Sequence, residues 1–194
     1  MGPADRRRRH HAGSRRCLPP GLVEQHPVKV FGIAGWSGAG KTTLLEKLII
    51  EIGGRGFSVS TLKHTHHAVD IDRPGKDSFR HREAGAIEVL VASSSRWALM
   101  HELRGGAEPP VEELIRHMTP VDLLIIEGFK SHAHPKLEVH RPSLGKPMLW
   151  PSDPTIAGIA SDQRLEGLTL PVLPLDDAAA IAEFVLAAVD LMAG

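Results

Sequence analysis

The stretch GWSGAGKT, from Gly35 to Thr42, matches the pattern G-x-x-x-x-G-K-[ST] at every fixed position. Its glycines let the backbone curl tightly, so that several N–H groups can converge on phosphate oxygens at the start of a helix. A β-branched apolar run precedes the loop and apolar residues at helical spacing follow it, which is the strand–loop–helix context that the pattern requires. The segment therefore predicts a binding site for a nucleoside triphosphate.

All residues of this Walker A loop except Trp36 have an expected role. Lys41 is the charge that contacts the β- and γ-phosphates and acts in catalysis, Thr42 is a Mg²⁺ ligand, and Thr43 reaches the α-phosphate. The remaining phosphate contacts are expected from Gly35, Ser37, Gly38, Ala39 and Gly40. A glycine-rich turn without a ligand is the alternative, and the flanking elements argue against it.

A phosphate loop of this kind also needs a carboxylate across the metal, usually at the end of a buried strand. The run DLLIIEG supplies Glu127 at the carboxyl end of the most strand-like segment of the chain. We therefore expect Glu127 to bind Mg²⁺ together with Thr42; an ordinary strand-terminal glutamate is the alternative. Asp122 begins the same strand, so it should lie at the far edge of the sheet and have no metal role.

A highly charged segment, KHTHHAVDIDRPGKDSFRHREAGA, runs from Lys63 to Ala86. It follows a predicted strand and should emerge beside the phosphate loop. Its carboxylates, Asp70 and Asp72, are candidates for the Mg²⁺ shell. Its cations are candidates for binding a second anion: Lys63, Arg73, Lys76, Arg80 and Arg82. A zinc site built from His64, His66 and His67 is less favoured because no cysteine can join it, and a solvated loop is the remaining alternative.

Strand-like and helix-like segments alternate along the chain. Strands are expected over 28–35, 57–64, 87–93, 96–101, 121–128, 136–141, 155–162 and 170–174, and helices over 41–54, 76–86, 109–118 and 176–192. Together with the glycine-rich motif, this alternation predicts an α/β, P-loop NTPase-type three-layer sandwich. Its mostly parallel sheet would be covered by helices on both faces, with a few extra antiparallel strands.

Length and composition favour one nucleotide-binding domain over 28–194 and a basic tail over 1–27. The tail holds six arginines against Asp5 and Glu24 and few large apolar residues, so we expect it to be disordered. A nucleic-acid arm, a presequence and a start codon placed too early are alternatives. The single cysteine, Cys17, fits a cytoplasmic protein, and no apolar run is long enough to predict a membrane span.

Three segments in order, GWSGAGKTTLLEKLI, KHTHHAVDIDRPGKDSFRHREAGA and DLLIIEGFK, resemble the molybdopterin-guanine dinucleotide biosynthesis adaptor (MobB) family. HPKLEVHR and GIASD fit the same family, and the resemblance covers about 28–190. Ala68 stands where relatives often carry an acidic residue, which puts a role for the first acidic position in doubt. The D-x-D-R-P-G-K-D-S segment is the most selective of these motifs.

The resemblance implies a dimeric, GTP-binding and weakly hydrolysing protein that assists the guanylyltransferase joining GMP to molybdopterin. By the same resemblance, Gly35 to Thr43 would hold the triphosphate, and Thr42 and Glu127 would bind Mg²⁺, with Asp72 as a further candidate ligand. The cations of the charged segment would then contact the pterin phosphate or a partner-bound nucleotide. The basic tail lies outside the resemblance, and no membrane or nucleic-acid partner is expected.

Guanine selection has no familiar signature, because the N-K-x-D motif is absent. Asp162, which follows a late strand, is the candidate acceptor for the guanine N1 and N2 groups. A small-molecule kinase is the alternative function, with Asp72 as the base and the SHAHP loop as a lid. Trp97, Leu99 and Leu103 are candidates for either a dimer interface or the core.

Overall fold

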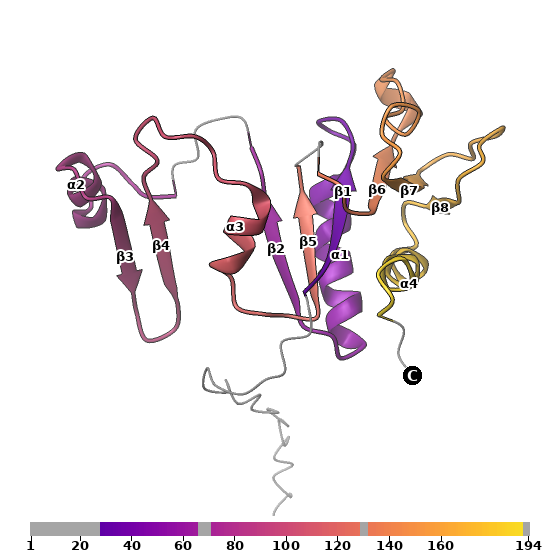
Figure 1. Ribbon diagram of the computed structural model, residues 1–194. Helices are drawn as coiled ribbons and strands as arrows, with labels where there is room; N and C mark the ends of the chain where they lie inside the picture. The colour runs from indigo at the N-terminus through magenta and orange to yellow at the C-terminus, as the bar shows by residue number, and fades with distance from the viewer. Residues whose placement is uncertain (1–27, 66–70, 129–131, 192–194) are drawn as a thin grey trace, which may run out of the picture.

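A computed structural model describes residues 28–65, 71–128 and 132–191 (Figure 1). The predicted basic tail, the candidate carboxylate Asp70 and the histidines His66 and His67 lie outside the described residues. None of the described helices is long and apolar enough to cross a membrane.

The centre of the fold is a six-stranded sheet in the order β2-β5-β1-β6-β7-β8. Its strands are β1 (Lys29–Ala34), β2 (Val59–Lys63), β5 (Leu123–Glu127), β6 (Lys136–His140), β7 (Ile156–Ser161) and β8 (Val172–Pro174). Every neighbouring pair is parallel. The carboxyl ends of all six strands therefore lie along one edge, where parallel sheets bind their ligands.

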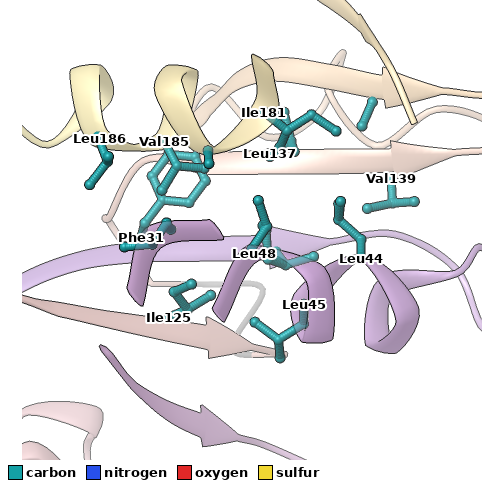
Figure 2. Close-up of a cluster of buried hydrophobic side chains, with 14 of the residues drawn as sticks. Phe31, Leu44, Leu45, Leu48, Ile125, Leu137, Val139, Ile181, Val185 and Leu186 are labelled. Atoms are coloured by element: carbon teal, nitrogen blue, oxygen red, sulfur yellow. The ribbon is translucent and has the colours of Figure 1, made fainter. Parts of the chain in front are cut away.

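Helices cover both faces of this sheet. Helices α1 (Lys41–Gly54) and α4 (Ala178–Ala188) pack on one face, where their apolar side chains form the main core (Figure 2). Within this core, the rings of Phe31 and Phe184 meet edge to face, with centroids 6.4 Å apart. The short helix α3 (Val111–Arg116) packs on the opposite face against Leu124 and Ile126. The predicted α/β class, with helices on both faces, is confirmed.

The face of β6 that points away from α1 and α4 is polar, although it is buried. Lys136, Glu138 and His140 alternate along the strand and are 1%, 0% and 6% exposed. The connection after β6 begins with a short 3₁₀ helix, η1 (Pro142–Leu144), and its residues 149–153 contact Lys136 and Glu138. Charged groups survive burial only when hydrogen bonds replace water, and here they do. The Glu138 carboxylate accepts from the backbone N–H groups of Leu149 (2.8 Å) and Trp150 (2.9 Å).

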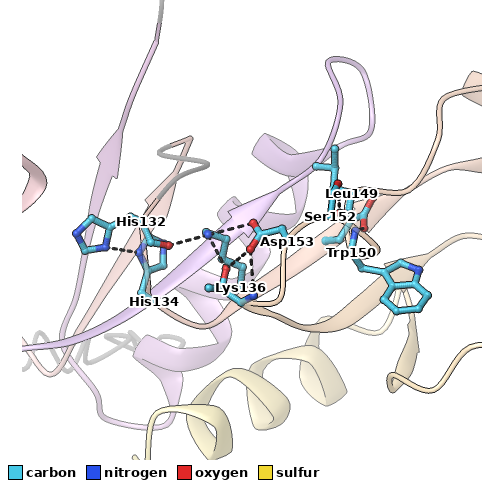
Figure 3. A network of polar contacts seen from close by, with 9 residues as sticks. His132, His134, Lys136, Leu149, Trp150, Ser152 and Asp153 are labelled. Atoms are coloured by element: carbon cyan, nitrogen blue, oxygen red, sulfur yellow. Dashed lines mark hydrogen bonds and ion pairs between the residues drawn. The ribbon is translucent and has the colours of Figure 1, made fainter.

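Lys136 belongs to a second polar network on this face (Figure 3). Its ammonium donates to the His132 carbonyl (2.8 Å), to Asp153 (3.1 Å) and to Thr155 (2.6 Å). His132 and His134 contact each other through their Nδ1 atoms, at 3.0 Å. These bonds hold the entry into β6, and parallel pairing with β1 brings its carboxyl end to the edge where the phosphate loop lies.

A second, smaller unit stands apart from the sheet in Figure 1. It contains α2 (Asp77–Glu83) and the antiparallel pair β3 (Glu88–Ala92) and β4 (Trp97–His101). This pair is the extra antiparallel structure that the sequence predicts. Many of its large apolar side chains remain exposed: Ile71, Ile87, Leu90, Val91, Trp97, Leu99 and Leu103.

Helix α1 has the predicted range, and the glycine with positive φ that follows it is Gly56. The other three helices are shorter than predicted. Helix α2 begins after Lys76, which is its N-cap residue, and has no side-chain cap. For α4 the cap is Asp177, whose carboxylate accepts from the backbone N–H of Ala180 at 2.9 Å.

Candidate functional site

The glycine-rich loop joins β1 to α1 at the carboxyl edge of the sheet (Figure 1). Gly35, Gly38 and Gly40 have φ values of 139°, 81° and 98°, a region that other residues rarely adopt. At Gly35 a side chain is also excluded sterically, because a Cβ atom would lie 2.5 Å from the Val139 carbonyl oxygen. The glycines therefore set the path of this loop, as its sequence pattern predicts.

The loop leads directly into the N-terminus of α1. Gly40 is the N-cap residue, and neither a side-chain cap nor an acidic residue in the first turn occupies this end. The first N–H groups of a helix have no intrahelical acceptor and lie at the positive end of the helix dipole. This 14-residue helix therefore offers an anion the donors that a phosphate needs.

Lys41 and Thr42 lie at this helix start. The Lys41 ammonium donates to the carbonyl oxygens of Gly35 (2.9 Å) and Trp36 (3.0 Å), so its charge lies across the loop. Thr42 and Thr43 are exposed, and their hydroxyls follow the loop on the first turn. The expected phosphate-binding residues are thus brought together on one contiguous stretch.

Glu127 ends β5, which lies between β1 and β2. In the register of the sheet, Glu127 pairs with Ile33 on β1 and with Lys63 on β2. Ile33 lies two residues before the loop begins at Gly35. Glu127 is 9% exposed, and the Lys63 ammonium lies 3.9 Å from its carboxylate. A largely buried carboxylate at this edge, with the Thr42 hydroxyl at the start of α1, is an oxygen-ligand set suited to Mg²⁺.

Asp122 lies at the other end of β5, as the sequence predicts. Its carboxylate accepts from the backbone N–H and the hydroxyl of Ser58, both at 2.6 Å. The side-chain bond from Ser58, followed by the backbone bond, lowers the pKa of Asp122. This carboxylate therefore joins β5 to the entry of β2.

A cavity of about 610 Å³ opens beside the loop on the α1 side of the sheet. Gly40, Thr43 and Lys47 line one side, and the ends of β7 and β8, including Asp162 and Asp176, line the other. The Asp162 carboxylate pairs with Arg141 at 2.9 Å. The candidate base acceptor is thus brought to the same cavity as the start of α1.

Arg141 is a site residue that sequence reasoning missed. It follows β6 and lines the same cavity, and its Nε donates to the carbonyl oxygen of Ala39 in the loop, at 2.9 Å. The charge at the end of the EVHR run was a signal for a residue at this edge of the sheet.

The predicted second-anion residues fall into two places. Lys63 lies beside Glu127, whereas Lys76 is the N-cap of α2 and Arg80 lies within it, 3.9 Å from Asp77. Asp72 belongs to the α2 side as well: its carboxylate accepts from Ser78 (3.0 Å) and from the N–H of Arg73. A role for Asp72 in catalysis or metal binding stays a prediction.

Asp72 also belongs to a charged cluster in the smaller unit. Its Oδ2 lies 3.7 Å from the Arg82 guanidinium, which pairs with Glu102 at 2.9 Å. Arg82 thereby joins α2 to Glu102, the residue that follows β4. Over the described parts of the chain, no group of three or more His, Cys, Asp and Glu side chains could hold a metal ion.

A six-stranded parallel sheet, a glycine-rich loop after β1 and an acidic strand end beside it define the class of α/β P-loop proteins. Within that class, residues 30–162 match the family model "Molybdopterin guanine dinucleotide synthesis protein B". The chain belongs to this family, MobB.

Two similar relatives carry the name molybdopterin-guanine dinucleotide biosynthesis adapter protein. The one from Escherichia coli (strain K12) is 40% identical over 162 residues, covering 82% of this chain and 92% of the relative. The one from Haemophilus influenzae is 39% identical over 164 residues, covering 84% and 91%.

Solved structures agree with this fold. A crystal structure of a molybdopterin-guanine biosynthesis protein B has a TM-score of 0.64 at 24% identity, covering 81% of this chain and 98% of that one. Bacillus subtilis MobB also has a TM-score of 0.64 at 24% identity, with 83% and 98% covered.

Proposed function

We propose that this protein acts in molybdopterin-guanine dinucleotide biosynthesis as an adaptor that binds GTP with Mg²⁺ and hydrolyses it slowly. The observation that carries the nucleotide part is the uncapped N-terminus of α1, which opens beside the cavity that Asp162 lines. The biosynthetic role rests on membership of the MobB family and on the names of its relatives.

The site residues fit a nucleoside triphosphate. The turns at Gly35, Gly38 and Gly40 leave room for phosphates close to the backbone, and the Lys41 charge lies over the loop. Beyond the start of α1, the cavity has space for a ribose and a base. A carboxylate there accepts two hydrogen bonds from guanine, whereas adenine has no matching pair of donors. Asp162 is the proposed acceptor.

Bound Mg²⁺ would supply charge neutralisation between the phosphate oxygens. The residues that would hold it are Thr42, through its hydroxyl, and Glu127, whose carboxylate is largely buried at the end of β5. Asp72 is not needed for this minimal set. Slow hydrolysis is part of this proposal, and analysis of the products tests it.

The proposed partners are a second copy of this chain and the guanylyltransferase. An isolated two-stranded hairpin is marginally stable in water. Here β3 and β4 present Leu90, Trp97 and Leu99 on one face at 60%, 64% and 42% exposure. A dimer that buries this face would remove the apolar surface from water. The cations Lys76 and Arg80 of α2 would then be available to a pterin phosphate or a partner-bound nucleotide.

The test is calorimetric titration with GTP and with ATP, each with and without Mg²⁺, followed by analysis of the products. Tight, Mg²⁺-dependent binding that favours GTP, with slow release of GDP, is the expected result. Lys41→Gln should weaken binding strongly, whereas Lys29→Gln, at the other end of β1, should not. A preference for ATP, or turnover that appears only with a small hydroxyl acceptor, would instead favour a kinase.

The second-anion site needs a separate measurement. Replacing Lys76 and Arg80 together by glutamine should weaken binding of a pterin phosphate and leave GTP affinity unchanged, because α2 stands apart from the sheet and its phosphate loop in Figure 1. Equal loss of both ligands would contradict this separation.

A further inference from the structure

Arg141 links two parts of the site that lie far apart in the sequence. Its Nε donates to the Ala39 carbonyl oxygen in the phosphate loop, 102 positions away, at 2.9 Å. Its Nη1 donates to the Asp162 carboxylate, 21 positions away, also at 2.9 Å. A single planar group therefore spans the distance between the loop and the end of β7.

The loop is shaped to allow this approach. A Cβ atom on Gly40 would lie 3.4 Å from Arg141 Nη2, and the positive φ of Gly40 already disfavours other residues there. The guanidinium can thus lie against the last turn before α1. Arginine suits this place because its fork bonds two acceptors in fixed directions, which the single ammonium of lysine does not.

We propose that Arg141 is a positioning residue that holds the Asp162 carboxylate at a set place relative to the phosphate loop, so that guanine recognition depends on Arg141. This inference rests on the proposed binding of GTP. It assigns Arg141 no contact with the base itself; Arg141 acts through Asp162.

Two physical effects support the role. Asp162 follows the end of β7 and its side chain is 32% exposed, so an unpaired carboxylate would sample several rotamers and lose entropy on binding a base. A bare carboxylate beside a triphosphate would also be repelled by it. The Arg141 charge offsets that repulsion and restricts the carboxylate before the nucleotide arrives.

A double-mutant cycle tests the proposal. The probes are GTP, ATP and inorganic tripolyphosphate, which has no base, and the proteins are the wild type, Arg141→Lys, Asp162→Asn and the double variant. We expect each single variant to lower the GTP-over-ATP preference by about tenfold, with no further loss in the double variant. Tripolyphosphate affinity in Arg141→Lys should change by less than about threefold.

The matched control is Arg55→Lys. Arg55 makes the same kind of bond, from its guanidinium to the Ala179 carbonyl oxygen at 2.9 Å, but it lies at the C-terminal end of α1. This variant should leave both nucleotide affinities unchanged. Thermal unfolding of each variant separates loss of fold from loss of binding.

The outcomes are distinct. A wild type that does not favour GTP overturns both the proposed function and this inference. A selective wild type whose Arg141→Lys variant keeps its selectivity, or loses GTP and tripolyphosphate affinity equally, overturns the inference alone. Additive losses in the double variant overturn it too.

If Arg141→Lys does not fold, Arg141→Gln takes its place in the double-mutant cycle. The wild type itself provides a further test. The NMR signal of the Arg141 Nε–H group should shift both with GMP and with tripolyphosphate, because the guanidinium joins the base side to the loop. A signal that responds to tripolyphosphate but not to GMP would overturn the proposal.

Discussion

Glu127 on β5 is the direct neighbour of Ile33 on β1, two residues before the phosphate loop begins. This register places a largely buried carboxylate at the edge of the sheet from which the loop and α1 emerge. The relationship follows from parallel pairing, which aligns the carboxyl ends of neighbouring strands.

The first prediction concerns this carboxylate. Glu127→Gln keeps the size of the side chain but removes the charge that Mg²⁺ requires. The Mg²⁺-dependent gain in GTP affinity should fall by at least the roughly tenfold that even an outer-shell metal residue contributes. Titration of GTP at several Mg²⁺ concentrations measures this gain.

Asp122→Asn is the control for that measurement, since Asp122 is the acidic residue at the opposite end of β5. Its bonds to Ser58 stabilise the protein but lie away from the loop. We expect a lower melting temperature and an unchanged Mg²⁺ effect. An equal loss of the Mg²⁺ effect in both variants would rule out the specific role of Glu127.

The second prediction concerns the loop backbone. Gly35→Ala should destabilise the protein by about 2 kcal/mol or more, because its φ of 139° is strained for alanine and its Cβ would meet the Val139 carbonyl oxygen. Gly53→Ala is the matched control. Apart from its chain neighbours and the backbone of its own helix, no atom lies within 4 Å of its Cβ position, so it should stabilise by about 0.5–1 kcal/mol.

Chemical denaturation of both variants measures these changes. A Gly35→Ala protein as stable as the wild type would contradict the described loop conformation. Nucleotide titration of the same proteins shows whether Gly35→Ala lowers nucleotide affinity while Gly53→Ala does not.

The third prediction is a pH dependence that comes from His134. Burial, and then the charge of Lys136, lower the pKa of His134 from 6.5 to about 4. Between these values the unfolded chain binds a proton that the folded protein does not, so stability falls as the pH drops through this window. The expected loss is on the order of 2 kcal/mol.

Denaturation measured from pH 7 to pH 4 tests this expectation. His134→Gln should remove this part of the slope, whereas His117→Gln, at an exposed position after α3, should keep it. An identical slope in the wild type and His134→Gln would mean that another group titrates.

The fourth prediction concerns the exposed face of the smaller unit. Leu90→Glu places a charge on a face that is 60% exposed at this residue in the single chain but would be buried in the proposed dimer. The dimer dissociation constant should rise by about thirtyfold or more, which corresponds to roughly 2 kcal/mol.

Analytical sedimentation at several protein concentrations measures this dimer dissociation constant. Ile50→Glu is the control, because Ile50 is 74% exposed on α1, away from β3 and β4. A wild type that is monomeric at all concentrations would rule out the proposed dimer.

The fold was largely predictable because its signals are local. The buried run before Gly35, the helical spacing after Thr42 and the run ending at Glu127 each specify an element and the end from which its ligand groups emerge. Parallel pairing then brings those ends together without further information.

The position of Asp72 could not be predicted from local sequence signals. Its segment comes after β2, which suggested a place beside the phosphate loop, but the chain continues into α2, where Ser78 and Arg82 contact the carboxylate. Sequence alone does not specify the direction of a long connection, because that direction depends on how the next helices and strands pack.

The sequence by itself determined the class of fold, the phosphate loop and the position of Glu127, since strand and helix periodicity and glycine chemistry act over a few neighbouring residues. Only the tertiary structure decided that Arg141 lies between Ala39 and Asp162 and that Lys76 and Arg80 lie on a separate unit. Such contacts join residues far apart in the chain, and their geometry is set by the packing of whole elements against one another.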